Sequence, residues 1–181
     1  MFKKLLPVAA LALTLVSGSA SAAFTGVYDL ANWTQVLNGG SIDITGAPNS
    51  VTLTSSNDGS GPDNTDLTII DQGTSAISFD WTYTNGDRDG SSFDPFGWLL
   101  NGVYTQLTAN GQFGAQSGSV KIDPTTTGDV FGFRIFATDS LLGSSNVVIS
   151  NFSTVPEPFS LALIGIGLVG LVATRRHKQS V

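Results

Sequence analysis

The chain has 181 residues, 41% of them hydrophobic and only 12% charged, which supplies one core of ordinary domain size and argues against wholesale disorder. The segment 24–154 has 13 Asp, no Glu and three basic residues; this excess of negative charge argues against nucleic acid as a partner, because phosphates require Lys and Arg. There is no Cys and the single His is His177, so disulfides, Cys-ligated zinc and catalysis by Cys or His in that segment are excluded.

The first 22 residues have the three parts of a secretory signal peptide. Two lysines stand near the start, an apolar run covers 5–16, and small residues follow it, with Ala20 and Ala22 placed as a small-x-small cleavage site. A buried helix or a permanent anchor fits less well, because the apolar run is short and a cleavage site follows it. We therefore predict that residues 1–22 are a signal peptide, and a lipoprotein route is excluded because no Cys follows the run.

The segment 23–154 has the pattern of a β domain. Residues 77–84 alternate between apolar and polar side chains, which is typical of a strand with one buried face. Shorter alternations occur at 41–45, 50–55, 130–138 and 146–153. Polar clusters with turn-forming residues punctuate the segment at 55–66, 85–97, 109–119 and 123–129.

Asn101-Gly102 lies between the apolar runs 98–100 and 103–105, and this dipeptide tolerates the positive φ of a two-residue hairpin turn. The only candidate helix, 28–37, is short. Many short strands separated by turn signals favour an antiparallel sandwich. We therefore predict an all-β, jelly-roll-like β-sandwich over 23–154.

The loop after residue 84 resembles the first half of a calcium loop, in which oxygen ligands alternate and a glycine makes the sharp turn. Its candidate ligands are Asn85, Asp87, Asp89 and Asp94. The position of the closing bidentate Glu holds Phe96, so Asp94 would have to take its place. A second acidic stretch, 58–66, also gathers carboxylates. Because Asp, Asn and Gly are the ordinary residues of tight turns, two interpretations stay open: a Ca²⁺ site or plain turns.

Five aromatic residues are candidates for presenting a flat face to sugar rings: Tyr28, Trp33, Trp81, Trp98 and Tyr104. Trp81 belongs to the apolar face of the strand over 77–84, and aromatic residues on strands are usually core residues. Trp33 and Trp98 lie near turns and are the better candidates for a sugar contact, although packing in the core or at its rim is favoured for both.

No catalytic constellation is recognisable in the segment 24–154. Glycoside hydrolases use a pair of carboxylates, but no spacing singles out two of the 13 Asp. Ser and Thr are abundant, yet no His is present to activate them, and no Gly-x-Ser-x-Gly turn occurs. The sequence therefore predicts a protein without enzyme activity.

The C-terminal segment has three elements in a fixed order: Val155-Pro156-Glu157-Pro158, an uncharged run over 159–173, and a basic cluster that contains Arg175 and Arg176. The run predicts a transmembrane helix of about 22 Å at 1.5 Å per residue, which is short for a hydrocarbon core of about 30 Å. The basic cluster is expected on the cytoplasmic side. A match to the dinucleotide-binding glycine pattern at 165–170 is rejected, because it lies inside this run and not in a βαβ unit.

These three elements resemble the C-terminal sorting signal of PEP-CTERM proteins, which are exported proteins of Gram-negative, often biofilm-forming bacteria. The resemblance covers 155–178 and implies that an exosortase in the cytoplasmic membrane recognises the Pro-Glu-Pro region and removes the tail. By this resemblance the recognition element would be Pro156, Glu157 and Pro158, with Val155 before them in the sorting signal, and the cytoplasmic stop would be Arg175 and Arg176. The body is similar to the small β-sandwich ectodomains often found before such tails, in 77–83, 94–97, Asn101-Gly102 and 148–153, and this similarity brings no catalytic motif.

We therefore expect a protein that is exported, held briefly in the inner membrane by its tail, and passed to the cell surface or the extracellular space. Its expected role is non-enzymatic, at the surface or in an exopolysaccharide matrix, as in biofilms. The alternative is a carbohydrate-binding module that docks exopolysaccharide, with or without Ca²⁺. The expected partners are the exosortase, the membrane before trimming, and exopolysaccharide.

Overall fold

The computed structural model describes residues 23–72, 75–123 and 125–156. The strands in this part of the chain are β1 (Thr34–Val36), β2 (Ser41–Asp43), β3 (Ser50–Thr54), β4 (Asp63–Ile70), β5 (Ser75–Thr84), β6 (Phe96–Leu100), β7 (Val103–Gln106), β8 (Gln116–Ile122), β9 (Val130–Ala137) and β10 (Asn146–Pro156). Two short 3-10 helices, η1 (Gly26–Tyr28) and η2 (Leu30–Asn32), precede them. The predicted all-β class is confirmed.

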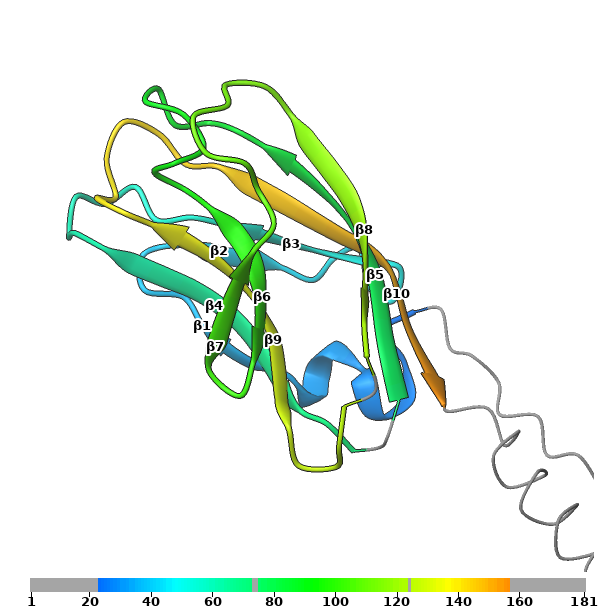
Figure 1. Cartoon of the computed structure of the whole chain (residues 1–181). Coiled ribbons are helices and arrows are strands. Elements are labelled where there is room, and N and C mark those ends of the chain that lie inside the picture. Colours follow the sequence, from blue (N-terminus) through cyan, green and yellow to red (C-terminus); the bar gives the residue numbers. More distant parts are fainter. Residues whose placement is uncertain (1–22, 73–74, 124, 157–181) are drawn as a thin grey trace, which may run out of the picture.

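The strands form two five-stranded antiparallel sheets that pack face to face (Figure 1). One sheet has the order β1-β4-β9-β6-β7, and the other has the order β2-β3-β10-β5-β8. From β3 to β10 the chain changes sheet at every step except the β6–β7 hairpin. This alternation gives the strand order of a jelly roll, with β1 and β2 added at the edges. The predicted antiparallel sandwich is therefore confirmed.

The alternation over 77–84 forms most of β5, and its inward side chains are at most 6% exposed. Those inward residues are Ile77, Phe79, Trp81 and Tyr83. Opposite them, β9 contributes Phe131 and Phe133, which are fully buried. The rings of Phe79 and Phe133 meet edge to face, with centroids 4.9 Å apart, an arrangement that aromatic pairs prefer. The core therefore lies between the two sheets, and its composition follows from the period-2 pattern of the strands.

The β6–β7 hairpin is the turn that Asn101-Gly102 predicts. Leu100 pairs with Val103 across it, and Asn101 and Gly102 have φ values of 50° and 79°. Two successive residues with positive φ fit the right-handed twist of the flanking strands. This local prediction is confirmed.

One end of the sandwich is closed by the segment that contains η1 and η2 (Figure 1). Phe24 stacks on Phe152 of β10 with ring centroids 4.7 Å apart, and the indole Nε1 of Trp33 donates to the Tyr28 carbonyl at 3.0 Å. The candidate helix at 28–37 is therefore a pair of 3-10 turns followed by β1. The Asp29 side chain favours this turn, because its Oδ1 accepts from the Ala31 amide at 2.9 Å and caps η2.

A buried carboxylate, Asp71, ties this end together. It is fully buried, and both the Tyr28 and Thr125 hydroxyls donate to its side chain. Its backbone joins the same cluster, since the Asp71 amide donates to the Asp129 carbonyl at 2.7 Å. Asp71 thus links the loop after β4 with η1 and with the loop before β9.

Candidate functional site

The end of β10 is the part of the described chain that reaches the C-terminal signal. The strand runs to Pro156, which pairs with Ser75 of β5, so the first residue of the recognition element is the last residue of the sandwich. Among the described residues, no helix is long and apolar enough to cross a membrane. The other sorting and cleavage residues lie outside the described residues; they are Ala20, Ala22, Glu157, Pro158, Arg175 and Arg176, together with the predicted helix 159–173.

The loop predicted to bind calcium is held by its own hydrogen bonds. The Asn85 side-chain amide donates to the Asp87 carbonyl at 2.7 Å, and the Asp89 amide donates to Asp87 Oδ1 at 2.6 Å, which are bonds of a tight turn. Asp94 is buried and accepts from the Ser145 amide at 2.9 Å. In the described segments, no three acidic or His side chains gather as metal ligands. Binding of Ca²⁺ by Asn85, Asp87, Asp89 and Asp94 stays a hypothesis beside the interpretation of the loop as plain turns.

Burial changes the acidity of two of these carboxyls. Loss of solvent raises the pKa of Asp94 and of Asp87 above their ordinary value, and the negative charge of Asp87 raises the pKa of Asp94 further. Hydrogen bonds from Ser55 and Ser145 act in the opposite direction on Asp94. Because the charged form is disfavoured in this place, each carboxyl holds its proton more tightly in the folded chain than in the unfolded chain.

This shift predicts a pH dependence of stability with a defined sign. Between the ordinary Asp pKa and the raised one, the folded chain binds more protons than the unfolded chain, so the free energy of unfolding falls as pH rises. Asp94→Asn removes this contribution and is expected to gain stability relative to wild type as the pH is raised from 4 to 7. Urea unfolding at several pH values measures the difference. The control is Asp43→Asn, since hydrogen bonds from Thr45 lower the pKa of exposed Asp43 and its contribution has the opposite sign. If the free energy of unfolding changed with pH in the same way for both variants, the raised pKa of Asp94 would be contradicted.

The aromatic candidates divide into core residues and one surface residue. Tyr28, Trp33 and Trp81 are each 6% exposed and belong to the hydrophobic core, and Trp98 packs against that core while partly buried. The preference for core packing of Trp33 and Trp98 over sugar contact is therefore confirmed. Tyr104 lies on the outer face of the sheet, because it pairs with Leu99 next to the outward-facing pair of Gly97 and Arg134.

A hollow of about 310 Å³ lies on this outer face. Its lining residues are Asn64, Tyr104, Arg134 and Phe136, from β4, β7 and β9. Arg134 is fixed by two hydrogen bonds to Asp66, from Nε at 2.7 Å and from Nη2 at 2.6 Å. The Tyr104 hydroxyl is buried and has no hydrogen-bond partner among the described residues. The hollow thus combines two aromatic rings with an oriented guanidinium and a side-chain amide.

Gly97 shapes the hollow by its lack of a side chain. A Cβ placed there would lie 2.7 Å from Tyr104 Cε2, which is closer than real Cβ atoms approach. The glycine therefore lets the Tyr104 ring lie over the sheet. Sequence reasoning missed Asn64, Arg134 and Phe136 as a group. The signal was present in the alternation over 130–138, which turns Arg134 and Phe136 away from the core.

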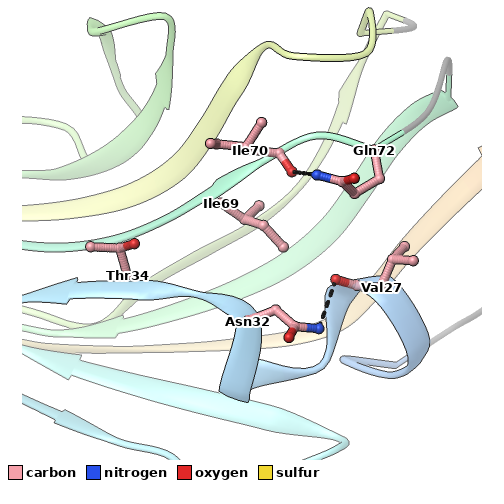
Figure 2. A pocket seen from close by; sticks show the side chains of 6 residues that line it. All are labelled: Val27, Asn32, Thr34, Ile69, Ile70 and Gln72. Carbon is pink, nitrogen blue, oxygen red and sulfur yellow. Dashed lines mark hydrogen bonds between the residues drawn. The ribbon is translucent and has the colours of Figure 1, made fainter.

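A second pocket, of about 410 Å³, lies beside the 3-10 turns (Figure 2). Its lining residues are Val27, Asn32, Thr34, Ile69, Ile70 and Gln72. Two of its side-chain amides are occupied by backbone: Asn32 Nδ2 donates to the Val27 carbonyl at 3.2 Å, and Gln72 Nε2 donates to the Ile70 carbonyl at 3.0 Å (Figure 2). None of the lining residues is titratable, so these six side chains supply no acid, base or nucleophilic pair.

Comparison with known families identifies the C-terminal segment. Residues 154–176 match the PEP-CTERM protein-sorting motif, which confirms the resemblance drawn from Pro156, Glu157 and Pro158. The chain therefore carries a PEP-CTERM protein-sorting motif, the signal of an exported protein that an exosortase sorts. No curated protein matches the chain.

Several solved structures align with the chain at low similarity. An arabinose-bound GH51 α-L-arabinofuranosidase is 16% identical over 77% of this chain, with a TM-score of 0.43, and the chain spans 25% of its length. The module TmCBM61, solved with β-1,4-galactotriose, is 10% identical over 71% of this chain and 90% of its own, with a TM-score of 0.41. A family 35 carbohydrate-binding module from an environmental isolate is 14% identical over 68% and 93% of the two chains, with a TM-score of 0.40. Similarity at this level assigns no function.

Proposed function

We propose that the protein is an exported, exosortase-processed component of the cell surface or of an exopolysaccharide matrix. The observation that carries the proposal is the sorting motif at 154–176, which begins on the last strand of the sandwich. In this account residues 1–22 direct export, the tail holds the chain in the inner membrane, and trimming hands the sandwich on to the surface of a Gram-negative, biofilm-forming cell.

The sandwich acts in this proposal without catalysis. The segment 24–154 has neither His nor Cys, so it holds no Cys nucleophile and no His that could activate a Ser or Thr hydroxyl. Two of the buried carboxyls, Asp87 and Asp94, interact with each other, and burial raises the pKa values of both. An acid–base pair of a glycosidase requires the two values to be driven apart. The Asp87 carboxylate is also engaged in its own turn, through the Asp89 amide.

A variant in the recognition element tests the sorting proposal. Replacing Pro156, Glu157 and Pro158 together by Ala is expected to leave the tail attached and the chain in the membrane fraction of the native host. The matched control replaces Ser50, Thr52 and Thr54 on β3 by Ala, which leaves the motif intact. Immunoblots of membrane and extracellular fractions with an antibody to the sandwich give the measurement. Equal release of both variants would contradict the proposal.

A second candidate function is binding of a neutral exopolysaccharide. The observation that favours it is the hollow on the outer sheet face, where Tyr104 and Phe136 offer rings to the apolar face of a sugar while Asn64 and Arg134 offer donors to its hydroxyls. Such a mixture of aromatic rings and a few placed polar groups is typical of small-molecule sites. The excess of Asp over Lys and Arg in 24–154 disfavours acidic polysaccharides.

Loss of one ring tests this second function. Tyr104→Ala is expected to weaken retention in gels that contain a neutral polysaccharide, by about 2 kcal/mol or roughly thirtyfold in Kd. Val103→Ala is the control, because Val103 neighbours Tyr104 on β7 and is 67% exposed. If the wild-type protein migrates equally in every polysaccharide gel, or if both variants bind as it does, the hollow is not a sugar site.

A further inference from the structure

The final strand changes its surroundings at Ser150. Before this point β10 lies between two partners, since Asn146 to Ser150 pair with β3 on one side and with β5 on the other. An irregularity follows between Ser150 and Ser153, where Asn151 has a φ of 49°. Among the described strands, only β5 pairs with the residues from Ser153 to Pro156. The last part of the strand is therefore held along one edge.

We propose that the residues from Ser153 to Pro156 must leave β5 before the exosortase can process the chain. The inference rests on the proposed processing. Extended peptides are recognised through their backbone as well as their side chains, so an enzyme that encloses the strand at Pro156 must reach both of its edges. In the folded sandwich Ser75 of β5 occupies one of these two edges at Pro156. The paired strand is thus a protected form of the substrate.

Phe152 sets the limit of this opening. Its side chain is 1% exposed and stacks on Phe24, with further ring contacts to Trp33 and Phe133 at 5.7 Å and 6.3 Å. Its neighbour Asn151 is fixed as well, because Asn151 Nδ2 donates to Asp80 Oδ2 at 2.7 Å. Pulling the strand past this point would take an aromatic ring out of the core, whereas opening up to it breaks only one-sided pairing. The sandwich therefore stays folded while its end is open.

Because the end of β10 is paired on one side only, it is expected to open from Pro156 toward Ser153. Strands buried in a sheet open with free energies close to that of global unfolding, while ends with few partners open locally at much lower free energy. Tension from a tail held in the membrane would act on Pro156 first, and each pair nearer to Ser153 in turn. The bulge between Ser150 and Ser153 separates this end from the doubly paired part of β10.

A reversible cross-link tests the proposal. Ser153 and Ser78 are directly paired, and opposed residues of antiparallel strands have the Cα separation that a disulfide needs. The chain has no Cys, so Ser78→Cys with Ser153→Cys allows a single bridge, which forms in an oxidising export compartment. We expect the bridged chains to keep their tail and the chains that remain as free thiols to lose it, as judged by non-reducing gels and thiol labelling.

The control places a bridge between the same strands before the bulge. Thr82→Cys with Val148→Cys joins another directly opposed pair of β5 and β10 and is expected to leave processing equal to wild type. Processing of chains bridged at Ser78 and Ser153, or a block by the control bridge, would overturn the inference. Retention of the tail by the wild-type chain would instead contradict the proposed exosortase processing, so the two failures are distinguishable.

Discussion

Phe152→Ala is expected to lower the free energy of unfolding by about 4 kcal/mol, the range found when a buried Phe is truncated. The ring is 1% exposed and joins β10 to the segment before β1, because it stacks on Phe24 at 4.7 Å and lies 5.5 Å from the Tyr28 ring. Truncation leaves a cavity between the 3-10 segment and β10, and the rigid sheets around it can close it only in part.

Chemical unfolding followed by tryptophan fluorescence measures this loss. The matched control is Phe113→Ala, since Phe113 is 69% exposed and its truncation is expected to change stability by less than about 0.5 kcal/mol. A loss below about 1 kcal/mol for Phe152→Ala would mean that the core does not extend to the end of the sandwich from which the tail leaves.

Asp71→Ala is expected to lower the free energy of unfolding by about 3 kcal/mol. The carboxylate is fully buried and accepts from the hydroxyls of Tyr28 and Thr125. Its removal takes a buried acceptor away from both hydroxyls, and the loss of a buried partner costs more than the net worth of the bonds themselves. Burial and the charge of Asp71 both raise the pKa of Tyr28, which agrees with a hydroxyl that stays a donor.

Two variants check the origin of the Asp71 effect. Tyr28→Phe removes one donor and is expected to cost about 1 kcal/mol, since the carboxylate keeps the hydrogen bond from Thr125. Gln72→Ala, at the exposed next position, is expected to be close to neutral. If Asp71→Ala were as stable as Gln72→Ala, the linkage of the three segments by Asp71 would be wrong.

The elements that the sequence predicts correctly are those with local signals. The alternation over 77–84 is enough to predict β5, because one face of that strand is buried and the other is not. Asn101-Gly102 suffices for the β6–β7 turn, because positive φ at both positions is a property of these two residues. The sorting motif depends on a short ordered pattern and needs no tertiary information at all.

The elements that the sequence does not predict depend on partners that are far away in the chain. The stretch 55–66 was predicted as a turn region, yet β4 begins at Asp63. Its polar side chains form hydrogen bonds with residues distant in the sequence. Arg134 donates to the Asp66 carboxylate, and the Thr65 hydroxyl donates to the Leu37 carbonyl at 3.1 Å. Polar residues on a strand look like a turn until those partners are known.

The candidate sites also depend on contacts between residues that are distant in the sequence. Asp94 belongs to the predicted calcium loop by sequence, but tertiary packing directs its carboxylate to Ser145 in the loop before β10. The outer-face hollow requires three strands, since β4, β7 and β9 bring Asn64, Tyr104 and Arg134 together. No periodicity within a single segment predicts such a convergence, because it is fixed by sheet order.

The most direct test of the whole account is the intact mass of the protein secreted by its native host. We predict a species that begins near Ala23 and ends close to Pro158, so that the apolar run and the basic residues after it are both gone. A full-length chain in the cytosol, or an extracellular species that still contains Arg175 and Arg176, would contradict the central claim that membrane sorting and trimming govern this protein.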